Sequence, residues 1–175
     1  GFWKLLAFGM QMCVILVTGF ALASTRAARR VIRWLADRPQ SGPQAVAMTA
    51  LIAMSAALVN WGLGLIVGAL MARDVGRSCQ RRGIPAHYPL VAAAGYTGLM
   101  VWHGGLSGTG PFKVTQAKDI AELLPGSGLD PIPLSETVFS PMNLGLNLAL
   151  MVWVPLLLVR LIPKRADEIE GLPPA

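Results

Sequence analysis

The stretch Gln44–Ala72, QAVAMTALIAMSAALVNWGLGLIVGALMA, decides the fold because its 29 residues include no charged side chain. A helix crosses the hydrocarbon core of a bilayer with about 20 residues, so this run is too long for a single crossing. Its middle, Asn60 to Gly64, holds a polar residue and two glycines. The run therefore predicts a membrane segment that is interrupted halfway.

The whole chain has the composition of a helical membrane protein. Of its 175 residues, 54% are hydrophobic and 14% are charged, and long segments carry no charge at all. The alternating pattern of a membrane β-barrel is absent. The arginines stand beside apolar runs, where positive charge orients membrane proteins, so the net charge of +6 does not indicate nucleic-acid binding. Cys13 and Cys79 form neither a disulfide framework nor a metal motif.

The rest of the chain divides around this run. We predict a transmembrane helix at 1–24, a cytoplasmic amphipathic segment at 25–43, a hairpin at 44–80, a broken transmembrane helix at 88–112, a polar outer segment at 113–141, a transmembrane helix at 142–162 and a cytoplasmic tail at 163–175. In 25–43, arginines and apolar residues fall on opposite helical faces, which indicates an interfacial helix; a solvated basic loop is the alternative. Pro155 is expected to kink the last helix. The start at Gly1 and the polar end suggest a piece of a longer protein.

The positions of the basic residues test whether 44–80 crosses the membrane. If it crosses once, seven basic residues lie on one side and eight on the other; if it enters and returns, the division is 12 to 3. The positive-inside rule favours the second arrangement. We therefore predict a re-entrant hairpin with its tip near Asn60–Gly64, with the basic segments in the cytoplasm and 113–141 outside.

A second interruption lies in Leu99–Phe112, LMVWHGGLSGTGPF. Non-helical backbone at membrane depth is tolerated only where protein or a watery cavity satisfies its polar groups, and two interrupted segments in a short chain indicate a transporter site. Free amides and positive helix ends bind anions, and free carbonyls bind Na⁺ or hydronium. The apolar parts of these segments contain no Asp, Glu, Lys or Arg, which favours small, weakly charged substrates.

Each feature of the two interruptions also has a simpler interpretation. Glycines in membrane helices often serve close packing, and Asn60 could join two helices. His103 could be a proton-linked switch, since the reference pKa of histidine is about 6.5, or an ordinary hydrogen-bonding residue. Lys113 follows Pro111 and could lie near the site, but an ordinary solvated lysine is the favoured interpretation. The sequence offers no catalytic residue and no metal-binding cluster, so neither an enzyme nor a cofactor beyond a coupling ion is expected.

Four stretches carry a family resemblance: FWKLLAFGMQMCVILVTGFALAS, NWGLGLIVGALMARDVGR, HYPLVAAAGYTGLMVWHGGLSGT and IPLSETVFSPMNL. In order and spacing they resemble the short-chain fatty acid transporter family, the bacterial acetoacetate and butyrate uptake permeases. The likeness covers essentially the whole chain and corresponds to the N-terminal half of that family. It implies an all-α membrane protein with transmembrane helices, a re-entrant hairpin and a broken helix, as one half of an inverted-repeat secondary transporter whose transport domain moves like an elevator.

The resemblance also implies a substrate and ion site. The hairpin tip would supply Asn60, Gly62 and Gly64, the broken helix would supply Gly104, Gly105, Ser107, Gly108 and Thr109, and Trp61, Trp102 and His103 lie beside them. His103 stands where the family has another glycine. The segment around Ser135, Glu136 and Thr137 also fits a stretch that recurs in the family.

The function implied is transport of short-chain monocarboxylates such as acetoacetate and butyrate across the bacterial inner membrane, by a multi-pass protein coupled to H⁺ or Na⁺. The expected partners are that substrate, the lipid bilayer, a missing second repeat of the same protein and a second copy in a homodimer, but no nucleic acid. A transporter of another organic anion, such as a dicarboxylate or citrate, and a structural membrane subunit are the alternatives.

Overall fold

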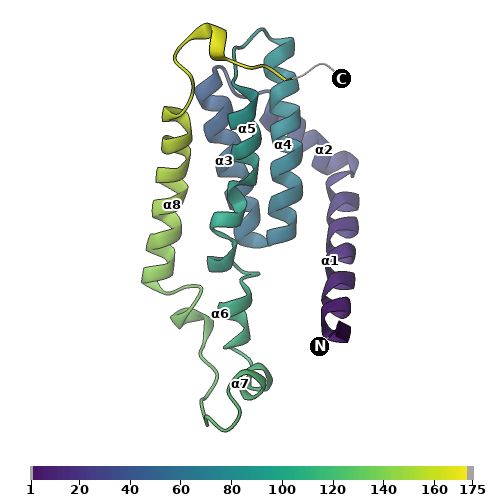
Figure 1. Cartoon of the computed structure of the whole chain (residues 1–175), viewed down its shortest axis with the longest axis vertical. Helices are drawn as coiled ribbons and strands as arrows, with labels where there is room; N and C mark the ends of the chain where they lie inside the picture. Colours follow the sequence, from purple (N-terminus) through teal and green to yellow (C-terminus); the bar gives the residue numbers. More distant parts are fainter. Residues whose placement is uncertain (1, 173–175) are drawn as a thin grey trace.

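The computed structural model describes residues 2–172 as helices joined by turns, with no strand in that range (Figure 1). The α-helices are α1 (Phe2–Ala23), α2 (Arg26–Ala36), α3 (Gly42–Val59), α4 (Trp61–Arg81), α5 (Tyr88–Tyr96), α6 (Thr109–Lys113), α7 (Ala117–Leu123) and α8 (Pro141–Arg160). Single 3₁₀ turns lie at Thr97–Met100, Trp102–Gly104, Leu134–Glu136 and Ala166–Glu168. Gly1 and 173–175, the ends of the predicted first helix and tail, lie outside the described residues. The expected all-α membrane fold is confirmed.

Side-chain caps fix where the long helices begin. The hydroxyls of Thr25 and Ser140 accept hydrogen bonds of 3.3 Å from backbone amides at the starts of α2 and α8. Ser41 does the same for α3, and proline occupies the first turn of α3 and of α8. Because the first amides of a helix have no partner within it, such caps define its start.

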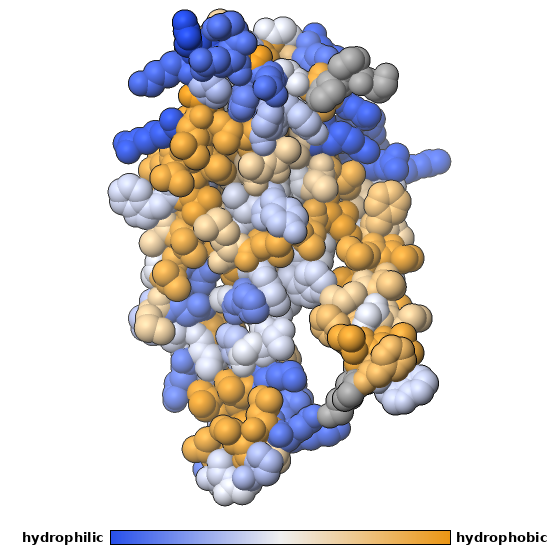
Figure 2. Space-filling model, viewed as in Figure 1, coloured by the Kyte–Doolittle hydropathy of each residue, from blue (hydrophilic) through white to orange (hydrophobic). Residues whose placement is uncertain are grey.

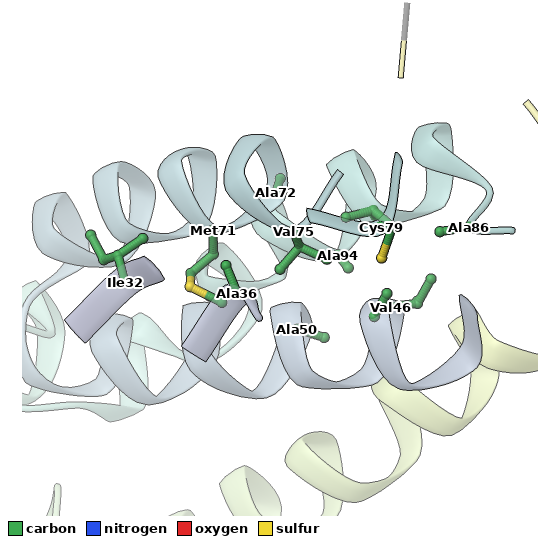
Figure 3. Close-up of a cluster of buried hydrophobic side chains, with 12 residues drawn as sticks. Ile32, Ala36, Val46, Ala50, Met71, Ala72, Val75, Cys79, Ala86 and Ala94 are labelled. Atoms are coloured by element: carbon green, nitrogen blue, oxygen red, sulfur yellow. The ribbon is translucent and has the colours of Figure 1, made fainter. Parts of the chain in front are cut away.

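The central feature is a pair of antiparallel helices, α3 and α4, that are joined by Asn60 alone (Figure 1). Their contact is built from small and medium side chains, which allow the two helices to approach closely. Figure 3 shows this core, in which buried residues of α3 and α4 meet others from α2, from α5 and from the loop that precedes α5: Ile32, Ala36, Val46, Ala50, Met71, Ala72, Val75, Cys79, Ala86 and Ala94. The interrupted run 44–72 thus forms a hairpin of helices.

Helix α1 runs parallel to α4. A Cβ atom at Gly62 would lie 2.5 Å from Cγ2 of Ile15, and one at Gly19 would lie 2.5 Å from Cδ1 of Ile66. These two close approaches set the register of the pair. The start of α4 therefore lies beside the middle of α1, and Figure 1 shows the lower end of α1 extending well past the α3–α4 turn.

The predicted broken helix is broken earlier than the sequence pattern indicates. The α-helix α5 ends at Tyr96, and 3₁₀ turns lead from Thr97 to Gly104. The Thr97 hydroxyl donates a 2.8 Å hydrogen bond to the carbonyl of Ala94, and such bonds compete with the helical ladder. Gly98 follows, and a Cβ there would lie 2.8 Å from the carbonyl oxygen of Ala53. Close packing on α3 thus accompanies the early end of the helix.

Three helices within the described residues are long and apolar enough to cross a bilayer: Leu5–Ala23, Gly42–Val59 and Pro141–Arg160. Apolar side chains cover much of the molecule, and hydrophilic ones gather at the end where α2 and the last turns of α4 lie (Figure 2). Helix α8 continues through Pro155 to Arg160 without interruption. The segment 113–141 contains α7 and extends beyond the opposite end of the bundle (Figure 1).

Candidate functional site

Two hydrogen bonds join the hairpin turn to the interrupted segment. The amide of Leu106 donates to the carbonyl of Leu58 at 2.7 Å, and the amide of Trp61 donates to Oγ of Ser107 at 2.9 Å. The family resemblance implied that both interruptions contribute to one site, and in the structure the two are in direct contact. The candidate site is this junction.

Asn60 organises the hairpin side of the junction. Its side-chain oxygen accepts hydrogen bonds from the amides of Gly62 (3.0 Å) and Leu63 (3.1 Å), so it caps α4. Its backbone oxygen accepts from the amide of Gly64, and Ser107 takes the Trp61 amide. The first four amides of α4 thus all have partners. The expectation of free amide groups at this tip is not met in this structure.

The two glycines of the tip lie within helix α4 and serve close packing. A Cβ at Gly64 would lie 2.5 Å from Cβ and 2.6 Å from Cα of Ala57, so any side chain would force α3 and α4 apart. Gly62 is buried against α1. The turn itself consists of Asn60 only. Of the two interpretations of this glycine pair, the packing interpretation describes its contacts.

On the other side of the junction, glycine lets the interrupted segment approach α3. Gly105 is buried in extended backbone, with φ −96° and ψ −174°. A Cβ there would lie 2.6 Å from Cα of Leu58 and would collide with its carbonyl oxygen. Because this approach permits the Leu106–Leu58 hydrogen bond, a side chain at position 105 would separate the two halves of the site.

Helix α8 contributes two asparagines that the sequence analysis missed. Nδ2 of Asn143 donates to the carbonyls of Gly104 (2.8 Å) and Val138 (2.7 Å). Nδ2 of Asn147, which is buried, donates in turn to the backbone and side-chain oxygens of Asn143, at 2.9 and 3.1 Å. Two asparagines four residues apart in an apolar span were the available signal, since polar residues within membrane helices usually face protein.

Aromatic rings border the junction. The Trp61 and Trp102 rings lie 6.0 Å apart between centroids, and the His103 ring lies 3.6 Å from that of Trp102. His103 is exposed, and its side chain makes no hydrogen bond to any other part of 2–172. The interpretation of His103 as an ordinary hydrogen-bonding residue requires a partner for its ring, and residues 2–172 supply none.

A cavity of about 280 Å³ opens beside the interrupted segment. Its polar side chains include Ser107, Thr109 and Lys113, and its apolar ones are Leu106 and Phe112. Gly108 contributes backbone, and Gln116 and Asp119 complete the wall. Lys113, for which the sequence left a solvated position and a position near the site as alternatives, is exposed and lines the same cavity as Ser107.

No group of three or more His, Cys, Asp or Glu side chains is close enough to hold a metal ion in residues 2–172. The polar groups of the junction are hydroxyls, carboxamides and backbone groups. These can bind and orient a small polar molecule but include no activated nucleophile.

These observations define the class of protein: a helical membrane protein in which a hairpin of two helices meets an interrupted helix. A family model described as short chain fatty acid transporter matches residues 1–173. The chain belongs to that family, which is a family of transporters and not of enzymes.

Two curated relatives have the same description. A candidate short-chain fatty acid transporter of Escherichia coli (strain K12) is 38% identical over 170 residues, which cover 97% of this chain and 37% of the relative. A second, from Haemophilus influenzae (strain ATCC 51907 / DSM 11121 / KW20 / Rd), is 34% identical over 170 residues, or 95% of this chain and 37% of the relative. The chain thus spans little more than a third of the length of these relatives. No solved structure matches it significantly.

Proposed function

We propose that this chain is part of a secondary transporter that carries short-chain monocarboxylates, such as acetoacetate and butyrate, across the bacterial inner membrane with H⁺ or Na⁺. The observation that carries the proposal is the hydrogen-bonded junction between the hairpin turn and the interrupted segment. Membership in the short-chain fatty acid transporter family supports the substrate class. The predicted site residues Asn60, Gly104, Gly105, Ser107 and Gly108 all belong to this junction or border it.

The cavity beside the junction has the chemistry that a short-chain fatty acid needs. Oγ of Ser107 accepts from the Trp61 amide, so its own O–H proton is available to donate to a carboxylate. The Thr109 hydroxyl and the Lys113 ammonium line the same cavity and add a second donor and a positive charge. Leu106 and Phe112 offer apolar surface to a short alkyl chain.

The single cationic side chain of this cavity favours one carboxylate over two. Its charged side chains are one lysine and one aspartate, Lys113 and Asp119. A monocarboxylate can take a position near the lysine, whereas a second carboxylate would need another cation. Dicarboxylates and citrate are therefore expected to bind more weakly unless the remainder of the full-length protein supplies that charge.

We further propose that the α3–α4 hairpin is re-entrant. In the parallel pair of α1 and α4, Gly62 lies against Ile15, and 13 residues of α1 precede Ile15. At 1.5 Å per residue those residues extend about 20 Å past the hairpin turn. If α1 crosses the bilayer, the turn lies inside the membrane. The uncharged part of α4, Trp61–Ala72, has the length of half a crossing.

The chain would form one of two inverted repeats. The matched length of 37% of each relative leaves room for a second copy of the motif. A second hairpin and interrupted helix would supply the facing half of the site, and movement of the two repeats together would provide alternating access. A homodimer is compatible with the exposed apolar faces of α1 and α8.

Uptake of labelled butyrate into proteoliposomes that contain the full-length protein tests this function. We expect uptake that depends on an imposed H⁺ or Na⁺ gradient, that unlabelled acetoacetate inhibits, and that succinate and citrate inhibit much less. Uptake of labelled succinate in place of butyrate would support the transporter of another anion. Absence of any gradient-driven uptake of these anions would contradict the proposal.

A further inference from the structure

The charged end of the molecule contains a second cavity that the transport function does not use. It has a volume of about 250 Å³ and lies where the end of α1, helix α2 and the second half of α4 meet. Four arginines line it: Arg29 and Arg33 of α2, and Arg73 and Arg77 of α4. The only acidic side chain in its lining is Asp74, so the formal net charge of the lining is +3.

Most of this positive charge has no partner in the described chain. Arg73 forms an ion pair with Asp74, with Nε 3.2 Å from Oδ1. Arg33 donates from Nε to the backbone carbonyl of Arg29 at 3.2 Å, which neutralises no charge. Arg29, Arg33 and Arg77 have no carboxylate within ion-pair distance among residues 2–172. Nearby Asp37 is already held by Ser78 and Arg81. Three guanidinium groups are thus available to an anion.

Apart from Ser24, the remainder of the lining is apolar, and it lies at the end of a candidate membrane span. Phe20, Ile32 and Leu70 form this part of the wall. An adjoining groove of about 280 Å³ is lined only by apolar residues, and it shares Ala23 and Ile32 with the arginine-lined cavity. The register of α1 and α4 puts Leu70 level with Ala23, the last residue of α1, and Arg73 and Arg77 follow one and two turns later.

We propose that this cavity binds the headgroup of an anionic phospholipid. The arginine fork suits the oxygens of a phosphate, and basic pockets between helices at the cytoplasmic face are suited to anionic lipid headgroups. The apolar wall and the adjoining apolar groove favour a lipid over free phosphate. The acyl chain of a lipid can pack against this apolar surface, whereas free phosphate has no apolar part. The phosphate would lie between α2 and α4 and would hold the amphipathic helix against the hairpin.

The test compares two pairs of arginines in the full-length protein purified in detergent. Arg33→Gln with Arg77→Gln removes two charges from the cavity, whereas Arg26→Gln with Arg30→Gln removes two from α2 at positions that do not line it. The probes are dioleoyl phosphatidylglycerol, dioleoyl phosphatidylcholine and inorganic phosphate. The measurements are the shift in thermal unfolding midpoint and the number of lipids retained in native mass spectrometry.

We expect phosphatidylglycerol to raise the midpoint of the wild type and of the Arg26/Arg30 pair by several degrees, and the Arg33/Arg77 pair to lose at least two thirds of that shift. We also expect one retained phosphatidylglycerol to be lost only in the cavity pair. The midpoint without lipid shows whether each variant is folded; if the cavity pair is not, Arg77→Gln alone should lose about half of the shift. Equal losses in both pairs, an equal response to phosphatidylcholine, or a full response to inorganic phosphate would overturn the proposal.

Discussion

The backbone amide of Trp61 donates a hydrogen bond to the hydroxyl oxygen of Ser107, 2.9 Å away and 46 positions later in the sequence. This bond joins the first residue of α4 to the non-helical segment after Gly105. It serves the fold, because it caps an amide at a helix start. It also orients the Ser107 hydroxyl next to the cavity in which we expect the substrate.

Ser107→Ala should therefore affect both stability and transport. Loss of the hydroxyl leaves the half-buried Trp61 amide without its partner, which costs about 1 kcal/mol of unfolding free energy. Loss of a donor to the carboxylate should raise the KM for butyrate by about tenfold, since tenfold corresponds to about 1.4 kcal/mol. Proteoliposome uptake and thermal unfolding measure the two effects. Ser55→Ala, on an exposed part of α3, is the control and should change neither.

Gly105→Leu should abolish butyrate uptake while the protein still inserts into the membrane. The leucine side chain would occupy the space of the Leu58 backbone and separate the hairpin turn from the interrupted segment. Gly145→Leu is the matched control, because a Cβ at Gly145 in α8 meets no atom within 4 Å. Normal uptake by Gly105→Leu would show that the two interruptions need not touch.

Asn143→Asp tests the role of α8. The substitution keeps the size of the side chain but removes the amide that donates to the carbonyls of Gly104 and Val138. We expect a loss of about 1–3 kcal/mol in unfolding free energy and a marked fall in uptake. Met142→Ala, which alters an exposed neighbour, should have little effect. If Asn143→Asp is as stable and active as the wild type, the two hydrogen bonds do not hold the interrupted segment.

The re-entrant hairpin is tested by the sidedness of two cysteines. Both variants are made in a background with Ser at positions 13 and 79. Arg38→Cys introduces a thiol just before α3, and Arg77→Cys introduces one near the end of α4. Both should react with a membrane-impermeant maleimide from the cytoplasmic side only, because α4 returns to the side from which α3 enters. Labelling from opposite sides of the membrane would mean that the hairpin crosses.

Much of this architecture could be predicted from the sequence. The interrupted, charge-free run 44–72 indicated a hairpin, and the structure has a hairpin of two helices whose turn is at Asn60. The distribution of arginines indicated that this hairpin is re-entrant, which stays a prediction. Hydropathy and charge act over whole segments, so they predict which segments are helical and how they pair. They do not report contacts between individual atoms.

The details of the site depend on such contacts. Gly62 and Gly64 looked like part of the turn, but both are helical and pack against Ile15 and Ala57. Helix α5 ends at Tyr96, where a side-chain hydrogen bond of Thr97 and close packing of Gly98 accompany its end, and a hydropathy pattern contains neither contact. Asn143 and Asn147 could have been singled out as polar residues in an apolar span, but their partners could not have been named.

The central claim is that the cavity beside the junction binds the monocarboxylate, and protection of an introduced cysteine tests it most directly. Thr109→Cys puts a thiol in the cavity lining at a position whose side chain makes no hydrogen bond within the described residues. In a background with Ser at positions 13 and 79, saturating butyrate should slow maleimide labelling of Thr109→Cys at least fivefold, while butanol should not. Labelling of Ser127→Cys, in the exposed loop after α7, should not change. An equal labelling rate of Thr109→Cys with and without butyrate, in protein that transports butyrate, would contradict the account.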